Sequence, residues 1–418
     1  MTETSHLLAA PLPLPGGAVL PNRLAKAAMS EGLADADNHA TPRLETLYRR
    51  WARSGAGLLL SGNIQVDRWH LERPGNIVLE NESGLPALAR MVEAGRSGGA
   101  HFWAQISHTG RQVDSAINAE PLAPSSVEID VIRGAGFSFA MPRPMTDKEI
   151  AHAVGQFATT ARLAKEAGFT GVQLHAAHGY LFSQFLSPLS NRRTDRWGGA
   201  LENRARFLLE TIAAVRAAVG PGYPIAIKLN ASDFQKGGFT NAECITLTRW
   251  LNSATLDLLE LSGGSLEQPK QVGASLKDEG EDGRKTSTIK REAYFLEFAG
   301  AVRAAAKMPV MVTGGFRSAA AMAEAVAAGE LDLIGIGRPL IADPRAAAKL
   351  LSGESARAFE PDIGLFHLLP WNNMQLERLA DGREPYLALS GADAVAAFKD
   401  LEAENVRRVL GRRKGQAA

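Results

Sequence analysis

The chain has 418 residues, with 46 Lys and Arg against 45 Asp and Glu, a formal charge of +1 and 45% hydrophobic residues. It lacks the basic excess of a nucleic-acid or anionic-membrane binder, so we expect no nucleic-acid partner, no membrane partner and a small molecule as substrate. Because its single cysteine excludes an intramolecular disulfide and a cysteine-ligated iron–sulfur cluster, we expect a reducing, cytoplasmic location.

The first residues do not predict an export signal. Glu3 stands where a signal carries positive charge, and three prolines interrupt the apolar stretch that follows. Apolar runs such as 57–61 and 331–336 fall far short of the roughly 18 residues that a membrane helix requires. We therefore expect a soluble protein.

Short apolar runs alternate with helical patterns along the chain, which is typical of β-α units around a parallel sheet. Strands are predicted over 23–29, 57–63, 101–107, 171–175, 224–230, 256–262, 309–314 and 331–337. Helices are predicted over 42–53, 147–167, 201–219, 241–253, 292–307 and 318–328. The pattern favours a closed (β/α)8 TIM barrel with an N-terminal hairpin, and leaves an open doubly wound sheet as the alternative.

Helix starts carry recognisable caps. Thr146 with Glu149, and Thr240 with Glu243, have the spacing of capping boxes, in which a hydroxyl and a carboxylate satisfy free backbone N–H groups. Ser318 is predicted to cap a further helix in the same way.

Two segments after strand ends, 112–145 and 263–290, are too long for simple connections. Strand C-termini form the active-site face of a barrel. In the first segment, apolar runs at 127–132 and 137–140 flank a glycine-containing turn and predict a β-hairpin lid or pocket wall. The second is rich in Gly and charged residues and is interpreted as a surface loop, with a partner contact as the alternative.

One barrel is assigned to residues 1–352, and a C-terminal extension, 353–418, is expected to pack on it without forming an independent domain. The extension contains a helical pattern over 389–410. Its basic residues favour a solvated helix end, with an oligomer contact as the alternative. These residues are Arg407, Arg408, Arg412, Arg413 and Lys414.

His175, His178 and Tyr180 lie in the run HAAHGY at the end of the fourth predicted strand. Imidazoles at this place can donate hydrogen bonds to a carbonyl oxygen and polarise a conjugated C=C, while the phenol supplies a proton to Cα. Two histidines three residues apart can also bind a metal, but no third ligand stands at a recognisable spacing, so we expect none. Structurally hydrogen-bonded histidines are the other alternative.

Gly314-Gly315 and Gly337-Arg338 end the seventh and eighth predicted strands. Loops at these places commonly bind phosphate in TIM barrels, because glycine admits the backbone N–H groups and arginine supplies charge-assisted hydrogen bonds. A phosphorylated ligand is therefore predicted, although either glycine pair taken singly is also compatible with a simple turn.

Other polar residues lie at predicted strand ends. Lys228 needs an electronegative partner, which a reduced flavin or a salt bridge provides. Gln105 can bond the edge of a heterocyclic ring, whereas His108 is interpreted as structural support for its loop. The small residues at 27–30 permit close backbone approach, and Ser30 can bond a polar ring atom; a buried strand end is the alternative.

The stretch 171–207, GVQLHAAHGYLFSQFLSPLSNRRTDRWGGALENRARF, resembles the signature of the Old Yellow Enzyme family of FMN-dependent ene-reductases. The resemblance extends to Pro21-Asn22-Arg23, 105–111, 142–146, Lys228 and the two glycine loops, roughly residues 8–345.

The resemblance implies FMN at the C-terminal face of the barrel, reduced by NADPH or NADH in the same pocket. It also implies hydride transfer from the flavin to Cβ of an α,β-unsaturated carbonyl or nitro compound. His175 and His178 would bind the activating oxygen, and Tyr180 would protonate Cα. The residues implied around the flavin are Ala27, Ala28, Met29, Ser30, Asn63, Gln105 and Lys228, with Gly314, Gly315, Gly337 and Arg338 at its phosphate.

The chain departs from the family pattern in three places. Ser30 replaces a frequent cysteine or threonine, Gly32 stands where some relatives carry an aromatic residue, and Asn63 stands where many have a small one. The redox tuning of the flavin, the shape of the pocket and the substrate preference are therefore not carried over from the resemblance. The alternatives are an FMN-dependent dehydrogenase, a quinone or nitro reductase on the same barrel, or a flavin-binding protein without turnover. The natural substrate, the nicotinamide preference and a homo-oligomer stay open.

Overall fold

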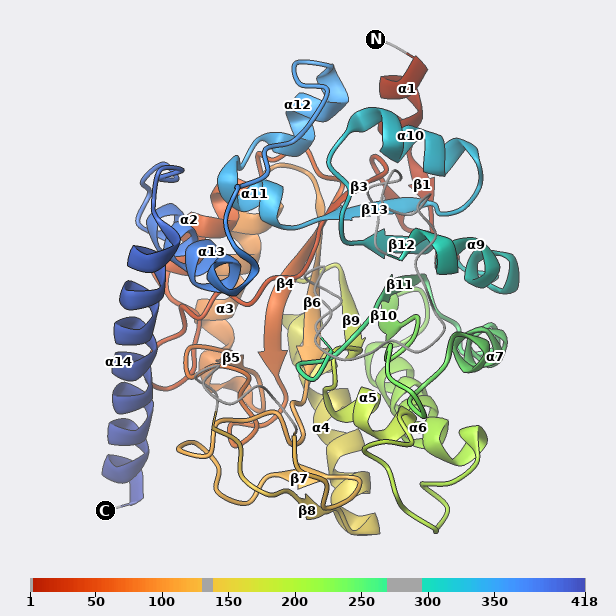
Figure 1. Ribbon diagram of the computed structural model, residues 1–418, viewed down its shortest axis with the longest axis vertical. Coiled ribbons are helices and arrows are strands. Elements are labelled where there is room, and N and C mark those ends of the chain that lie inside the picture. Colours follow the sequence, from red (N-terminus) through yellow and green to blue (C-terminus); the bar gives the residue numbers. More distant parts are fainter. Residues whose placement is uncertain (1–2, 130–137, 269–294, 418) are drawn as a thin grey trace.

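The computed structural model describes residues 3–129, 138–268 and 295–417 (Figure 1). Eight parallel strands close into a barrel, because the last strand pairs with the first and the first with the second. In order, they are β3 Leu24–Lys26, β4 Leu58–Gln65, β6 His101–Ser107, β9 Gly171–Ala176, β10 Ile225–Asn230, β11 Leu258–Ser262, β12 Val310–Thr313 and β13 Leu333–Ile336. The predicted (β/α)8 TIM barrel is thus confirmed, and the open sheet is excluded.

Helices surround the barrel and bury one face against it. Within the described residues they are α1 Glu3–Ala9, α2 Pro42–Trp51, α3 Leu85–Arg96, α4 Asp147–Glu166, α5 Leu181–Leu186, α6 Leu201–Val219, α7 Asn241–Leu251, α9 Leu296–Ala305, α10 Ala319–Ala327, α11 Arg338–Ala342 and α12 Ala346–Ser352. Both predicted capping boxes are confirmed at α4 and α7, and Ser318 caps α10. The first three residues of the helix predicted over 292–307 lie outside the described part.

The N-terminal end of the barrel is closed by the predicted N-terminal hairpin. Its strands β1 Leu12–Pro13 and β2 Val19–Leu20 pair antiparallel. Leu12, Leu14 and Leu20 share a buried cluster with inward residues from the beginnings of the barrel strands, including Trp103 and Met311. Because this apolar plug fills the N-terminal end, the polar inward residues lie at the C-terminal end, the active-site face of a TIM barrel.

The insertion after β6 contains two short strands, β7 Leu122–Ala123 and β8 Arg143–Pro144, which pair with each other in parallel. The predicted hairpin turn lies outside the described residues. In the described flanks, residues 127–129 form no strand, and Ser115 N donates to Ser138 O over 2.8 Å. The flank at 138–139 thus pairs with 114–115. Most of the second insertion, from 269 onward, also lies outside the described part.

The C-terminal extension consists of α13 Leu365–Ala380 and α14 Gly391–Ala417, and α14 runs along the outside of the barrel beside α13 (Figure 1). Arg407, Arg408 and Arg412 are exposed, as expected for a solvated helix end, and three of the basic residues also contact the barrel. Arg408 donates to Ala34 O over 3.0 Å, and Arg412 pairs with Asp37 at 2.7 Å. Arg413 donates to a carbonyl of the loop after β4 and lies over an indole ring there. No helix among the described residues combines the length and apolarity needed to cross a membrane.

Candidate active site

A buried polar layer lies next to the apolar plug, on its C-terminal side. It is built from inward residues of five neighbouring strands, β6, β9, β10, β11 and β12. Lys228 and Glu260 stand in register on β10 and β11, and their side chains form an ion pair of 3.0 Å. Gln105 donates to Gln173 over 2.6 Å, and Gln173 donates to Glu260 over 2.7 Å. Thr313 adds a third bond to Glu260 at 2.6 Å. Glu260 is therefore bonded by three side chains of the layer.

The sequence prediction placed Lys228 and Gln105 at a flavin ring, with a salt-bridged lysine as the alternative. The salt bridge is present. An ammonium has three N–H donors, so one bond to Glu260 leaves donors for a bound electronegative ring edge. Glu260 and Gln173 were not predicted, although each stands two residues from another inward residue of its strand, a spacing that period-2 counting can find.

His175, His178 and Tyr180 are brought together at the end of β9, as predicted. Between ring centroids, the imidazole of His175 lies 4.9 Å from that of His178 and 4.8 Å from the phenol of Tyr180. His178 and Gly179 have φ values of 61° and 77°, the left-handed region that a histidine adopts only when its surroundings hold it there. The holding contact is a bond from His178 N to Asn230 Oδ1 of 3.1 Å.

A chain of hydrogen bonds runs through the two imidazoles. His175 Nδ1 lies 2.8 Å from Asn63 Oδ1, and His175 Nε2 lies 3.0 Å from His178 Nδ1. His178 Nε2 lies 2.7 Å from Ser262 Oγ. Burial, and after it the neighbouring positive charge of Lys228, lowers the pKa of His178 well below its usual value, and burial does the same for His175. Both rings are therefore neutral near pH 7.

Glu72, in the loop after β4, completes this cluster and was missed in the sequence. Its carboxylate accepts a hydrogen bond from Asn63 Nδ2 at 2.7 Å and another from Ser30 Oγ. Burial, followed by the charge of Glu72 and hydrogen bonding to it, raises the pKa of the Tyr180 phenol well above its usual value. No motif marks Glu72, because it lies in an irregular loop.

The loops after β12 and β13, where a phosphate site was predicted, depend on glycine. Gly314 and Gly315 have φ values of 120° and 95°, which favour glycine. A Cβ added at Gly337 would lie 3.3 Å from Sδ of Met29 and 3.9 Å from Cβ of Ala27. Glycine at 337 therefore lets the loop after β13 pack closely against the segment after β3, so Ala27, Met29 and Gly337, all predicted around FMN, adjoin. Arg338 begins α11 at the same place.

Gly32 does not open the pocket, because the guanidinium of Arg73 fills its place. A Cβ added at Gly32 would lie 2.7 Å from Cζ of Arg73. Arg73 pairs with Glu402 of α14 at 2.8 Å, and it also bonds Asn373 of α13 and Ser30 O. The C-terminal extension thus supports the loop that carries Glu72.

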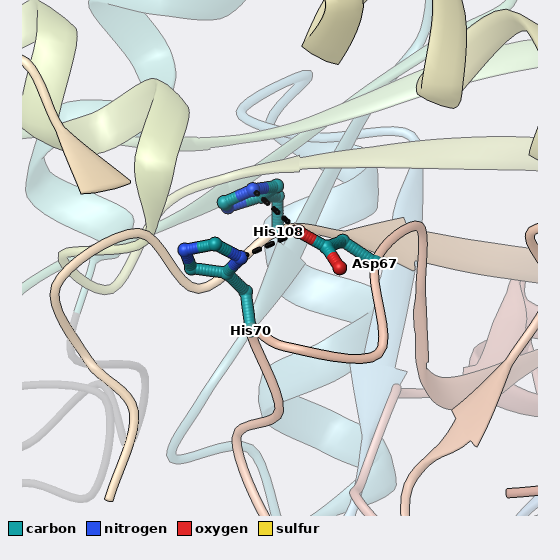
Figure 2. A group of neighbouring side chains, drawn as sticks. All are labelled: Asp67, His70 and His108. Atoms are coloured by element: carbon teal, nitrogen blue, oxygen red, sulfur yellow. Dashed lines mark hydrogen bonds and ion pairs between the residues drawn. The ribbon is translucent and has the colours of Figure 1, made fainter. Parts of the chain in front are cut away.

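Among the described residues, Asp67, His70 and His108 form a group spaced for a metal, with ligand atoms within 4.8 Å of one another (Figure 2). His70 Nδ1 lies 2.6 Å from Asp67, and His108 Nε2 lies 3.8 Å from it. The other nitrogen of each ring accepts a backbone N–H, from Leu122 at 3.1 Å and from Gly110 at 3.0 Å. Each imidazole therefore carries its proton on the side of Asp67, where a metal would need a lone pair. The geometry favours structural support, the role predicted for His108.

Comparison with known proteins agrees with this geometry. Residues 8–356 match the model of the NADH:flavin oxidoreductase / NADH oxidase family. The NADH-dependent flavin oxidoreductase nadA of Aspergillus parasiticus is 36% identical over 394 residues, covering 90% of this chain and 86% of that protein. The NADH-dependent flavin oxidoreductase iliE of Neonectria sp. is 34% identical over 372 residues, covering 84% of this chain and 48% of that protein, so this chain spans about half of its length.

Among solved structures, an Old Yellow Enzyme homologue from Zymomonas mobilis matches with a TM-score of 0.71 at 25% identity, covering 86% of this chain and 96% of that one. The chain belongs to the NADH:flavin oxidoreductase / NADH oxidase family, a class of FMN oxidoreductases that take electrons from NADH or NADPH. Within that class it is a member of the Old Yellow Enzyme family, and its cofactors are FMN and a nicotinamide.

Proposed function

We propose that this chain reduces the activated C=C bond of α,β-unsaturated carbonyl or nitro compounds. The observation that carries the proposal is a cluster of two neutral imidazoles and a buried phenol, in which the ring of His175 contacts both others, at the barrel mouth that also bears the glycine loops. When bound, FMN supplies the hydride that it takes from NADH or NADPH.

The side chains have separable tasks in this proposal. His175 and His178 hold the activating oxygen, and a hydrogen bond to it stabilises the negative charge that develops there. Tyr180 gives the proton that Cα needs; its raised pKa keeps the phenol protonated at neutral pH. Lys228 and Gln105 would hold the flavin ring, and the loops at Gly314 and Gly337 its phosphate.

Other residues would complete the flavin pocket. Ala27 and Met29 adjoin the glycine loop after β13, which supports their assignment to the flavin. The remaining candidates are Ala28, Ser30, Asn63, Gly315 and Arg338. Asn63 and Ser30 both donate hydrogen bonds to Glu72. Since Asn63 also bonds His175, these two candidates for the flavin pocket belong to the same hydrogen-bond network as the histidines.

Rates of NADH and NADPH oxidation with cyclohexenone, a quinone and a nitroaromatic test the proposal. We expect bound FMN, and turnover that is highest with the enone. His175→Gln should raise KM for the enone at least about tenfold. The matched control is His39→Gln, because His39 bonds Ser83 at 3.1 Å, outside the cluster at the end of β9. A protein that does not bind FMN, or that turns over only quinones or nitroaromatics, contradicts the proposal.

A further inference from the structure

The loop after β3 has no helix or strand of its own between residues 27 and 41, although it carries the residues assigned to the flavin from that strand. It packs against the loop after β4. Ala34 N donates to Gly75 O over 3.0 Å, and a Cβ added at Gly75 would lie 2.2 Å from Gly32 O. Because a side chain does not fit at that distance, the two loops meet backbone against backbone and form one unit.

The guanidinium of Arg73 joins this unit to the C-terminal extension. Arg73 is 8% exposed, and its Nη1 donates to Ser30 O over 3.3 Å and to Asn373 Oδ1 of α13. Its Nη2 and Nε donate to the carboxylate of Glu402 over 2.8 and 3.3 Å. The guanidinium also lies 5.2 Å from the centre of the Phe398 ring. Among the described residues, each side chain that bonds it or stacks on it therefore belongs to α13 or α14.

Glu402 is the counter-charge of this buried cation. Removal of one partner of a buried ion pair leaves the other charge uncompensated, so without Glu402 the guanidinium would favour water over its place beside Gly32. Gly32 has a φ of 70° and no side chain of its own to fill that space. The segment from Ser30 to Gly32 would then lose the group that packs against it and bonds its backbone.

The rest of α14 lies on the same loops. Arg408 donates to Ala34 O over 3.0 Å, Arg412 pairs with Asp37 at 2.7 Å, and Val409 between them is fully buried. The pair at Arg412 is largely exposed, and exposed pairs contribute little. The buried pair of Arg73 and Glu402 is therefore the contact through which α14 acts most strongly on the loop after β3.

We propose that Glu402 is a positioning residue for the flavin, acting through Arg73 on the backbone of Ser30 and Gly32. The C-terminal extension is then a part of the FMN site that lies outside the pocket, and the flavin binds tightly only when α14 is docked. This inference rests on the proposed assignment of Ser30 and the residues before it to the flavin pocket.

The dissociation constant of FMN, measured by fluorescence titration of the flavin-free protein, tests the proposal. Glu402→Leu and Arg73→Met should each raise it about tenfold. The double variant should be no weaker than either single variant, because Glu402 acts through Arg73. Urea unfolding without FMN identifies the variants that are folded. If Glu402→Leu is not, Glu402→Gln, which keeps the side-chain volume, takes its place with the same expected direction.

Glu404→Leu is the matched control, because Glu404 lies on the same helix, is 62% exposed and pairs with Arg407 at 2.6 Å. It should leave the dissociation constant unchanged. A folded Glu402 variant that binds FMN within about twofold of the wild type, or single effects that multiply in the double variant, overturns the proposal. The titration needs no alkene, so a failure to reduce enones would contradict the proposed function without changing this result.

Discussion

The ion pair between Lys228 and Glu260 gives the sharpest prediction about stability. Their side chains are 5% and 0% exposed, so Glu260→Gln leaves a buried ammonium without its counter-charge. Removing one partner of a buried pair costs about 3–5 kcal/mol. Glutamine keeps an oxygen for the bonds from Gln173 or Thr313, so we expect the lower end, about 3 kcal/mol of unfolding free energy.

The assay is urea unfolding of Glu260→Gln, Lys228→Met and the double variant, each without added FMN. Because the double variant removes both charges together, it should lose less than the sum of the single losses, by about 2 kcal/mol. Single losses that add within about 0.5 kcal/mol would show that the two groups do not stabilise one another, and would refute the reasoning.

Three further predictions follow from the site and its surroundings. Tyr180→Phe should slow flavin reoxidation by an alkene at least about 100-fold in stopped flow and leave flavin reduction by NADH nearly unchanged; equal slowing would remove the phenol from protonation. Although burial opposes it, the hydrogen bond from His70 holds the pKa of Asp67 well below its usual range. The folded pKa of Asp67 is therefore below the unfolded one, so the stability that its ionised carboxylate contributes is present above about pH 5 and lost as pH falls. Asp67→Asn should flatten the acid limb of the Tm-against-pH curve, and an unchanged limb would contradict the pairing of Asp67 with His70. Gly314→Ala should weaken FMN binding at least about tenfold in a fluorescence titration, since φ of 120° strains alanine; unchanged affinity would separate this loop from the phosphate.

The barrel strands were predictable because each is a buried parallel strand with a short apolar run and a helical pattern after it. The capping boxes at Thr146 and Thr240 were equally local signals, and both are confirmed. The cluster of His175, His178 and Tyr180 was predictable because it lies within six consecutive residues at one strand end.

Partners far apart in the sequence were not predictable. Glu72 lies in an irregular loop whose course depends on Asn38 and on the docking of Arg73 against α14. The docking of Arg412 on Asp37 joins residues 375 positions apart, and no local pattern distinguishes it from a solvated charge. Glu260 could have been predicted, since it stands in register with Lys228 on the next strand.

Reduction of an alkene by the FMN-bound chain is tested most directly in a single turnover. The bound flavin is reduced anaerobically with one equivalent of NADH and then mixed with cyclohexenone. The account predicts that the flavin reoxidises and that one cyclohexanone forms per flavin. A flavin that stays reduced with the enone, yet is oxidised by a quinone or a nitroaromatic, would contradict it.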